Sequence, residues 1–126
     1  MGETNRVVKS VGPTPGSLAN YITKRIQGEG KAIHSQNKYF SDTLNKIKND
    51  LDSNDPVIAL IAWSPMRMHY VNVVAVSDED DIAILDTNNK FYYYTRSDYE
   101  ELLDRRSYIP HNFCLDNYNL IRIYKT

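Results

Sequence analysis

One uninterrupted apolar run, from Val57 to Trp63, constrains the fold of this chain more than any other feature of its sequence. The run has the length of a β-strand, and it lacks the alternation of apolar and polar residues that marks a strand with one wet face. It therefore predicts a central strand that is covered on both faces. It is also far shorter than the ~20 apolar residues that a membrane-spanning helix needs, so we expect no membrane span.

The residues on either side of this run divide the chain into helices first and strands afterwards. In chain order we predict a helix over 15–27, a short extended piece at 31–33, a helix over 41–51, strands at 57–63, 69–76, 82–85 and 91–95, a helix from Ser97, and a final strand at 120–124. Thr14 or Ser17, Ser41 and Ser97 are the expected helix caps. This order indicates an α+β domain, in which N-terminal helices are followed by a mostly antiparallel sheet of about five strands with one inserted helix.

A histidine and an aspartate are positioned to meet at one edge of this sheet. His69 begins one predicted strand, and Asp86 follows the next. If these strands pair through the acidic turn at 77–81, the start of one lies beside the end of the other. A carboxylate that binds one imidazole nitrogen orients the ring, and the second nitrogen can then take a proton from a nucleophile. The alternative is a solvated hydrogen bond at a strand end and an aspartate that serves its own turn.

Three phrases of the sequence carry a likeness to a known family. They are Asp55-Pro56-Val57-Ile58-Ala59-Leu60, His69-Tyr70-Val71-Asn72-Val73-Val74-Ala75-Val76 and Ile82-Ala83-Ile84-Leu85-Asp86. Together with the helical segments 14–22 and 41–51 and the strand–helix segment 91–103, they resemble papain-like cysteine peptidases over residues 12–105. The likeness is greatest to the bacterial double-glycine leader peptidases, which process bacteriocins. It implies a papain-like fold, a general base at His69 and an orienting carboxylate at Asp86.

The family's nucleophile is a cysteine at the start of the first helix, beside a glutamine of the oxyanion hole. No cysteine precedes His69 here, and neither Gln27 nor Gln36 falls at the oxyanion position. An alternative alignment puts Val11-Gly12-Pro13-Thr14 on the nucleophile motif, but valine then replaces the cysteine and one helix too few follows. The resemblance therefore implies an N-terminal arm over residues 1–11 and a leader-peptidase-like domain over 12–126 that lacks the nucleophile helix.

Cys114 offers a different nucleophile, because in circularly permuted papain-like enzymes the cysteine follows the histidine. Reactive cysteines usually lie at a helix N-terminus that lowers the thiol pKa. Cys114 instead falls in a predicted loop, where a thiol is more often a small buried hydrophobe.

Apolar and aromatic residues surround His69 in the sequence. Trp63, Met68 and Tyr70 are the candidate substrate-binding residues, because aromatic and methionine side chains suit adaptable peptide recognition. Packing at the edge of the sheet is an equally good explanation of the same residues.

Composition excludes several other classes of function. Fifteen Lys and Arg against 16 Asp and Glu give a net charge of −1, which leaves no basic excess for nucleic acid. The three histidines, His34, His69 and His111, have no metal-ligand spacing, and a single cysteine excludes a cysteine-rich zinc site. We expect no cofactor and no metal, and a cytoplasmic protein or one secreted without a visible signal peptide.

Two functions from different classes follow. In the first, the domain belongs to a cysteine peptidase-type hydrolase or acyltransferase, a chemistry that a bacterial effector or toxin could also use. Its nucleophile is absent from this chain, and a partner chain or another segment supplies the missing helix. In the second, the domain is an inactive relative that binds a peptide or protein segment in a cleft beside His69. Whether the chain is an enzyme stays open at this point.

Overall fold

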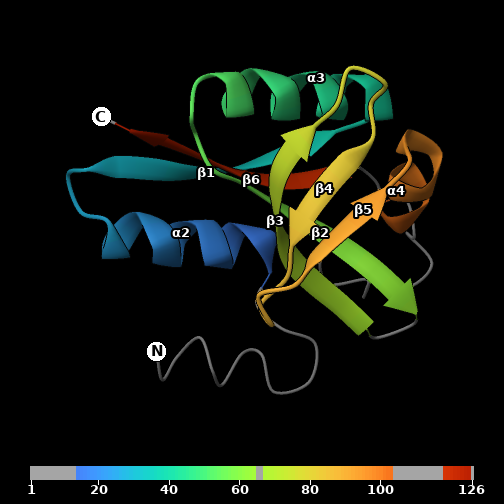
Figure 1. Ribbon diagram of the computed structural model, residues 1–126. Coiled ribbons are helices and arrows are strands. Elements are labelled where there is room, and N and C mark those ends of the chain that lie inside the picture. The colour runs from blue at the N-terminus through green and yellow to red at the C-terminus, as the bar shows by residue number, and fades with distance from the viewer. Residues whose placement is uncertain (1–13, 65–66, 104–117, 126) are drawn as a thin grey trace.

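The computed structural model describes residues 14–64, 67–103 and 118–125, and its centre is an antiparallel sheet with the strand order β1-β6-β2-β3-β4-β5 (Figure 1). The elements are α2 (Pro15–Arg25), β1 (Gly30–Asn37), α3 (Phe40–Asp52), β2 (Val57–Ser64), β3 (Arg67–Val76), β4 (Ile82–Leu85), β5 (Phe91–Tyr94), α4 (Arg96–Leu103) and β6 (Tyr118–Lys125). Every pair of neighbouring strands is antiparallel. The predicted α+β class is confirmed.

The apolar run forms the central strand β2, as predicted. Val57, Ala59 and Ile61 point to one face of the sheet, where they join the larger hydrophobic core. Ile58 points to the opposite face and packs against the smaller core. Because β2 pairs with β6 on one side and β3 on the other, its backbone is also enclosed.

Helices cover the two faces of the sheet, with α3 and α4 on one face and α2 on the other (Figure 1). The larger core lies under α3 and α4, and its most deeply buried large side chains are Tyr99, Ile47, Ile61, Ile82 and Ile84. The smaller core lies under α2 and centres on Ala19, Ala32 and Ile121. The two clusters therefore mark the two faces of the sheet, and a strand residue that belongs to one of them points to that face.

The first strand, β1, corrects the prediction of about five strands that follow the helices. The described sheet has six strands, and β1 lies between α2 and α3 in the chain. The expected extended piece at 31–33 extends to eight residues, paired along their whole length with β6. Its sequence is mostly polar, so hydrophobic periodicity could not indicate its length. Gly30 is required in this pairing, because a Cβ atom there would lie 2.6 Å from the Tyr124 carbonyl oxygen.

The helix caps are partly as predicted. Thr14 caps α2, since its hydroxyl accepts a hydrogen bond from the Ser17 amide at 3.2 Å. Ser41 and Ser97 were wrong predictions. The N-cap of α3 is Tyr39, without a side-chain cap bond, and burial of Phe40 against the aromatic rings beneath it begins the helix ahead of Ser41.

The cap of α4 is displaced in the same direction. The Asp98 amide donates to the Thr95 hydroxyl at 3.2 Å, which makes Thr95 the capping side chain and leaves Ser97 inside the helix. In both helices the cap thus lies two residues before the predicted serine, at Tyr39 in α3 and at Thr95 in α4.

A buried ion pair fixes α3 to β6. Arg122 donates from Nε and Nη2 to the two carboxylate oxygens of Asp50, at 2.7 and 2.8 Å. The Asp50 side chain is only 4% exposed, and its hydrogen bonds raise the pKa of the Arg122 guanidinium. This bidentate geometry sets how the helix sits on the sheet.

Candidate functional site

The candidate site begins with the position of His69, the third residue of β3. It lies opposite Ile61 of β2 and shares a face of the sheet with Val71, which belongs to the core under α3 and α4. Its side chain is 28% exposed, so it borders both the core and solvent. His69 therefore lies on the face of the sheet that α3 and α4 cover.

Asp86 reaches His69 because β3 and β4 form an antiparallel hairpin. Asn72, in the middle of β3, pairs with Leu85 at the end of β4, so Asp86 comes next to the first half of β3. The Asp86 side chain is 9% exposed, and its Oδ1 contacts Nε2 of His69. The structure thus brings together the two residues that the sequence paired.

A tight turn after β4 holds the carboxylate in place. The Asp86 amide donates to the Lys90 carbonyl at 2.9 Å, and Asn89, at a φ of 63°, donates to the Asp86 carbonyl at 3.0 Å. Thr87 donates twice to Asp86 Oδ1, from its amide at 2.6 Å and its hydroxyl at 3.2 Å. The contribution of Thr87 to the site was not predicted from the sequence, although an aspartate that binds the following backbone is a common turn signal.

The electrostatics of the pair favour an ionised aspartate. The hydrogen bond with His69 is the main reason that the pKa of the Asp86 carboxyl lies below its ordinary value; burial opposes this effect, and the Thr87 amide adds to it. An ionised carboxylate can only accept hydrogen bonds, so Nε2 of His69 must carry the proton between them. Proton transfer to or from a third group would then use Nδ1.

Of the three predicted substrate-binding residues, Tyr70 is the one whose side chain the structure describes, and it does not share a face of the sheet with His69. Tyr70 is its neighbour in β3 and points to the opposite face, where it packs against the core under α2. Burial there raises the pKa of the Tyr70 hydroxyl. Trp63 and Met68 lie within β2 and β3, and their side chains fall outside the described part of the structure.

Cys114 and His111 also lie outside the described residues, as do residues 1–13 with the Val11-Gly12-Pro13 segment. His34 is described and lies on β1, where its Nε2 binds Asn119 Oδ1 at 2.8 Å. Two strands, β6 and β2, separate it from β3, a span of about 14 Å at ~4.8 Å per strand. His34 and His69 are thus too far apart to share a ligand.

Within residues 14–64, 67–103 and 118–125, no three histidine, cysteine or acidic side chains form a group that could hold a metal ion. None of the helices in those ranges is long and apolar enough to cross a membrane.

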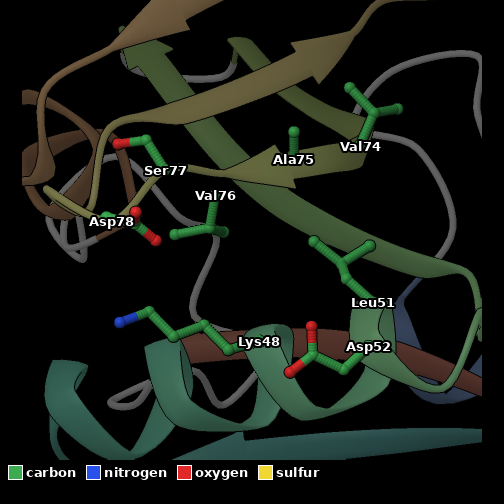
Figure 2. A pocket seen from close by; sticks show the side chains of 8 residues that line it. All are labelled: Lys48, Leu51, Asp52, Val74, Ala75, Val76, Ser77 and Asp78. Atoms are coloured by element: carbon green, nitrogen blue, oxygen red, sulfur yellow. The ribbon is translucent and has the colours of Figure 1, made fainter.

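Two hollows that the described residues line are separate from the His69–Asp86 pair. Each has a volume of about 410 Å³ and lies between the C-terminal end of α3, or the segment that follows it, and the far end of β3. Figure 2 shows the one that Lys48 and Val76 line. Val74, which lines both, is five residues beyond His69, or about 16 Å along an extended strand.

Comparisons with known proteins leave the family open. The chain matches no protein-family model, and neither the curated proteins nor the solved structures include a match to it. The proposal below therefore depends on the geometry of the described residues.

Proposed function

We propose that this chain is a papain-like cysteine peptidase-type domain, in which His69 is the general base and Asp86 orients it. The contact between His69 Nε2 and Asp86 Oδ1, made across the β3–β4 hairpin, is the observation that supports the proposal. Papain-like chemistry needs an imidazole held through one nitrogen by a carboxylate or amide oxygen, with the second nitrogen facing the thiol.

The proposed chemistry is acyl transfer from a peptide or amide. Nδ1 of His69 takes the proton from a thiol, and the thiolate attacks the substrate carbonyl carbon. The imidazolium then returns the proton to the leaving amine, which departs as the thioester forms. Water or another acceptor completes the transfer and regenerates the thiol. Asp86 contributes by holding the ring and by stabilising the imidazolium between the two proton transfers.

The thiol itself is the component that the printed sequence does not supply before His69. We propose that a partner chain or a further segment brings the nucleophile and its helix. The lack of that cysteine favours a second candidate function, in which the domain binds a peptide or protein segment beside His69 and leaves it intact.

A thiol supplied from solution tests the first function. All proteins in this assay carry Cys114→Ser, which removes the chain's own thiol. The protein with His69 and Asp86 intact would be incubated with N-acetylcysteamine and p-nitrophenyl acetate. We expect thiol-dependent release of p-nitrophenol to rise about tenfold over the uncatalysed reaction, less than the roughly 10²–10⁴-fold of a positioned general base, because the thiol is not tethered. His69→Ala should abolish the gain, and Asp86→Asn should reduce it.

His34→Ala is the matched control, because it removes a histidine that is also hydrogen-bonded through Nε2 but lies two strands away. A gain that survives His69→Ala, or that His34→Ala also removes, would contradict the assignment of the base. If no thiol-dependent gain occurs and a pool of fluorescein-labelled hexapeptides still binds in a His69-dependent way, the binding function is supported instead.

A further inference from the structure

A groove between α3 and the far end of β3 is built independently of His69 and Asp86. The two hollows described above lie next to each other, because Leu51 and Val74 line both, and the pair is called the groove below. Figure 2 shows Leu51 extending from the helix toward the strand, with Val76 facing it across the gap. The walls of the groove are therefore aliphatic, and one of them is a strand.

That strand has an open edge inside the groove. Pairing of β3 with β2 ends at Val73 opposite Val57, whereas pairing with β4 continues on the other side to Val76. In the described part of the chain, no strand pairs with residues 74–76 on the side of α3. A bulge between Val73 and Ala75 also leaves Val74 39% exposed. Unpaired backbone groups of this kind can pair with an added strand.

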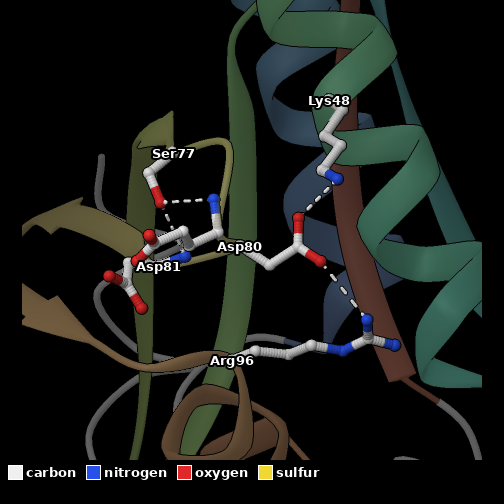
Figure 3. Close-up of polar contacts among 6 residues, drawn as sticks. Lys48, Ser77, Asp80, Asp81 and Arg96 are labelled. Carbon is white, nitrogen blue, oxygen red and sulfur yellow. Dashed lines mark hydrogen bonds and ion pairs between the residues drawn. The ribbon is translucent and has the colours of Figure 1, made fainter.

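The charges at the rim of the groove are mostly negative. Lys48 is its one lining cation, and its Nζ lies 2.5 Å from Asp80 Oδ1, while Asp80 Oδ2 also accepts from Arg96 (Figure 3). Asp52 and Asp78 line the same end of the groove, and neither forms an ion pair with any described residue. Lys48 and Arg96 share the one carboxylate of Asp80, so with Asp52 and Asp78 the charges at this end of the groove still sum to −1.

We propose that this groove binds an extended protein segment that carries lysine or arginine beside aliphatic residues. The segment would add to the open edge of β3 at residues 74–76 through backbone hydrogen bonds, which is a common mode of peptide recognition. Its aliphatic side chains would pack on Leu51 and Val76, and its basic side chain would lie between Asp52 and Asp78. The site is separate from the His69 edge, so it does not depend on the function proposed there.

Two matched peptides test this site. One alternates valine with lysine over six residues, and the other replaces each lysine by glutamate. Binding to the full chain would be measured by backbone amide NMR titration at low salt. We expect the lysine peptide to shift the amides of Val74, Ala75 and Val76 and the glutamate peptide to leave them unchanged. A joint Asp52→Asn and Asp78→Asn variant should weaken binding by about fivefold, which two partly exposed ion pairs can account for.

The joint Asp42→Asn and Asp98→Asn variant is the matched control, since it also removes two negative charges, from exposed first turns of α3 and α4 that do not line the groove. Equal binding of both peptides would overturn the proposal, as would amide shifts confined to other strands. So would an affinity that the Asp52→Asn and Asp78→Asn variant changes no more than the Asp42→Asn and Asp98→Asn control does. A lysine peptide that shifts no amide at millimolar concentration would overturn it as well.

Discussion

At the scale of single residues, one carboxylate oxygen organises the candidate site. Asp86 Oδ1 accepts from His69 Nε2, from the Thr87 amide and from the Thr87 hydroxyl. The two bonds from Thr87 fix the carboxylate relative to the turn, and the imidazole is then held relative to the carboxylate. A small change at Asp86 should therefore affect both the position of His69 and the stability of the hairpin.

Asp86→Asn should lower the free energy of unfolding by about 1 kcal/mol at pH 7, because an amide keeps the shape but loses the charge-assisted bond. The folded pKa of Asp86 is depressed, so the stability from its ionised form is present above the ordinary value of about 3.9 and is lost as the pH falls below it. Urea unfolding at pH 7, 5, 4 and 3 should show the two proteins converging at the acid end.

Asp81→Asn is the control for this comparison, since it makes the same replacement at an exposed aspartate of the β3–β4 turn. A difference between wild type and Asp86→Asn that stays constant from pH 7 to pH 3 would contradict the lowered pKa.

The residue scale also shows what the sequence could and could not predict about the site. The pair itself was predictable, because it depends only on the pairing of two consecutive strands. Tyr70 could have been excluded from the face of His69, since neighbouring residues of a strand point to opposite faces. Thr87 was harder to find, because its contribution comes from a backbone amide and a rotatable hydroxyl.

At the scale of elements, apolar patterns located β2, β3, β4, β5 and β6 and all three described helices. They could not give the length of β1, because its residues are mostly polar and its pairing is with a distant strand, β6. They also misplaced the starts of α3 and α4, where burial of Phe40 and capping by Thr95 outweighed the local preference of serine.

The ion pair between α3 and β6 gives a test at this scale. Asp50→Ala should lower the free energy of unfolding by about 3 kcal/mol, because it leaves the Arg122 guanidinium largely buried without its partner. The joint Asp50→Leu and Arg122→Met variant should lose less, about 1 kcal/mol, because it removes both charges and keeps apolar volume. Urea unfolding of the three proteins measures the difference. A double variant as unstable as Asp50→Ala would show that shape, and not the buried charge, dominates.

At the scale of the whole molecule, the sheet carries two features at opposite ends of one strand. The His69–Asp86 pair lies at the start of β3, and the acidic groove lies at its far end. The strand is central in the sheet and buried on the face that α3 and α4 cover, so it sets a fixed separation between the two. A single extended partner could contact both only by running along the sheet.

Whether Cys114 is a nucleophile can be tested in the whole chain, in which no cysteine precedes His69. Alkylation of Cys114 by iodoacetamide would be followed from pH 5 to pH 9 in wild type and in His69→Ala. We expect slow labelling that rises with pH as for an ordinary thiol and is unchanged by the substitution. Fast labelling at low pH that His69→Ala abolishes would instead identify a circularly permuted enzyme with Cys114 as its nucleophile.

The tautomer of His69 tests most directly whether Asp86 orients this histidine as a general base. It would be measured by two-bond ¹H–¹⁵N correlation NMR at a pH where the ring is neutral. A general base that Asp86 orients must carry its proton on Nε2 and leave Nδ1 to accept one. We expect the Nε2–H tautomer in wild type and a mixture of tautomers in Asp86→Ala. An Nδ1–H tautomer in wild type, or a tautomer that Asp86→Ala leaves unchanged, would contradict this role of Asp86.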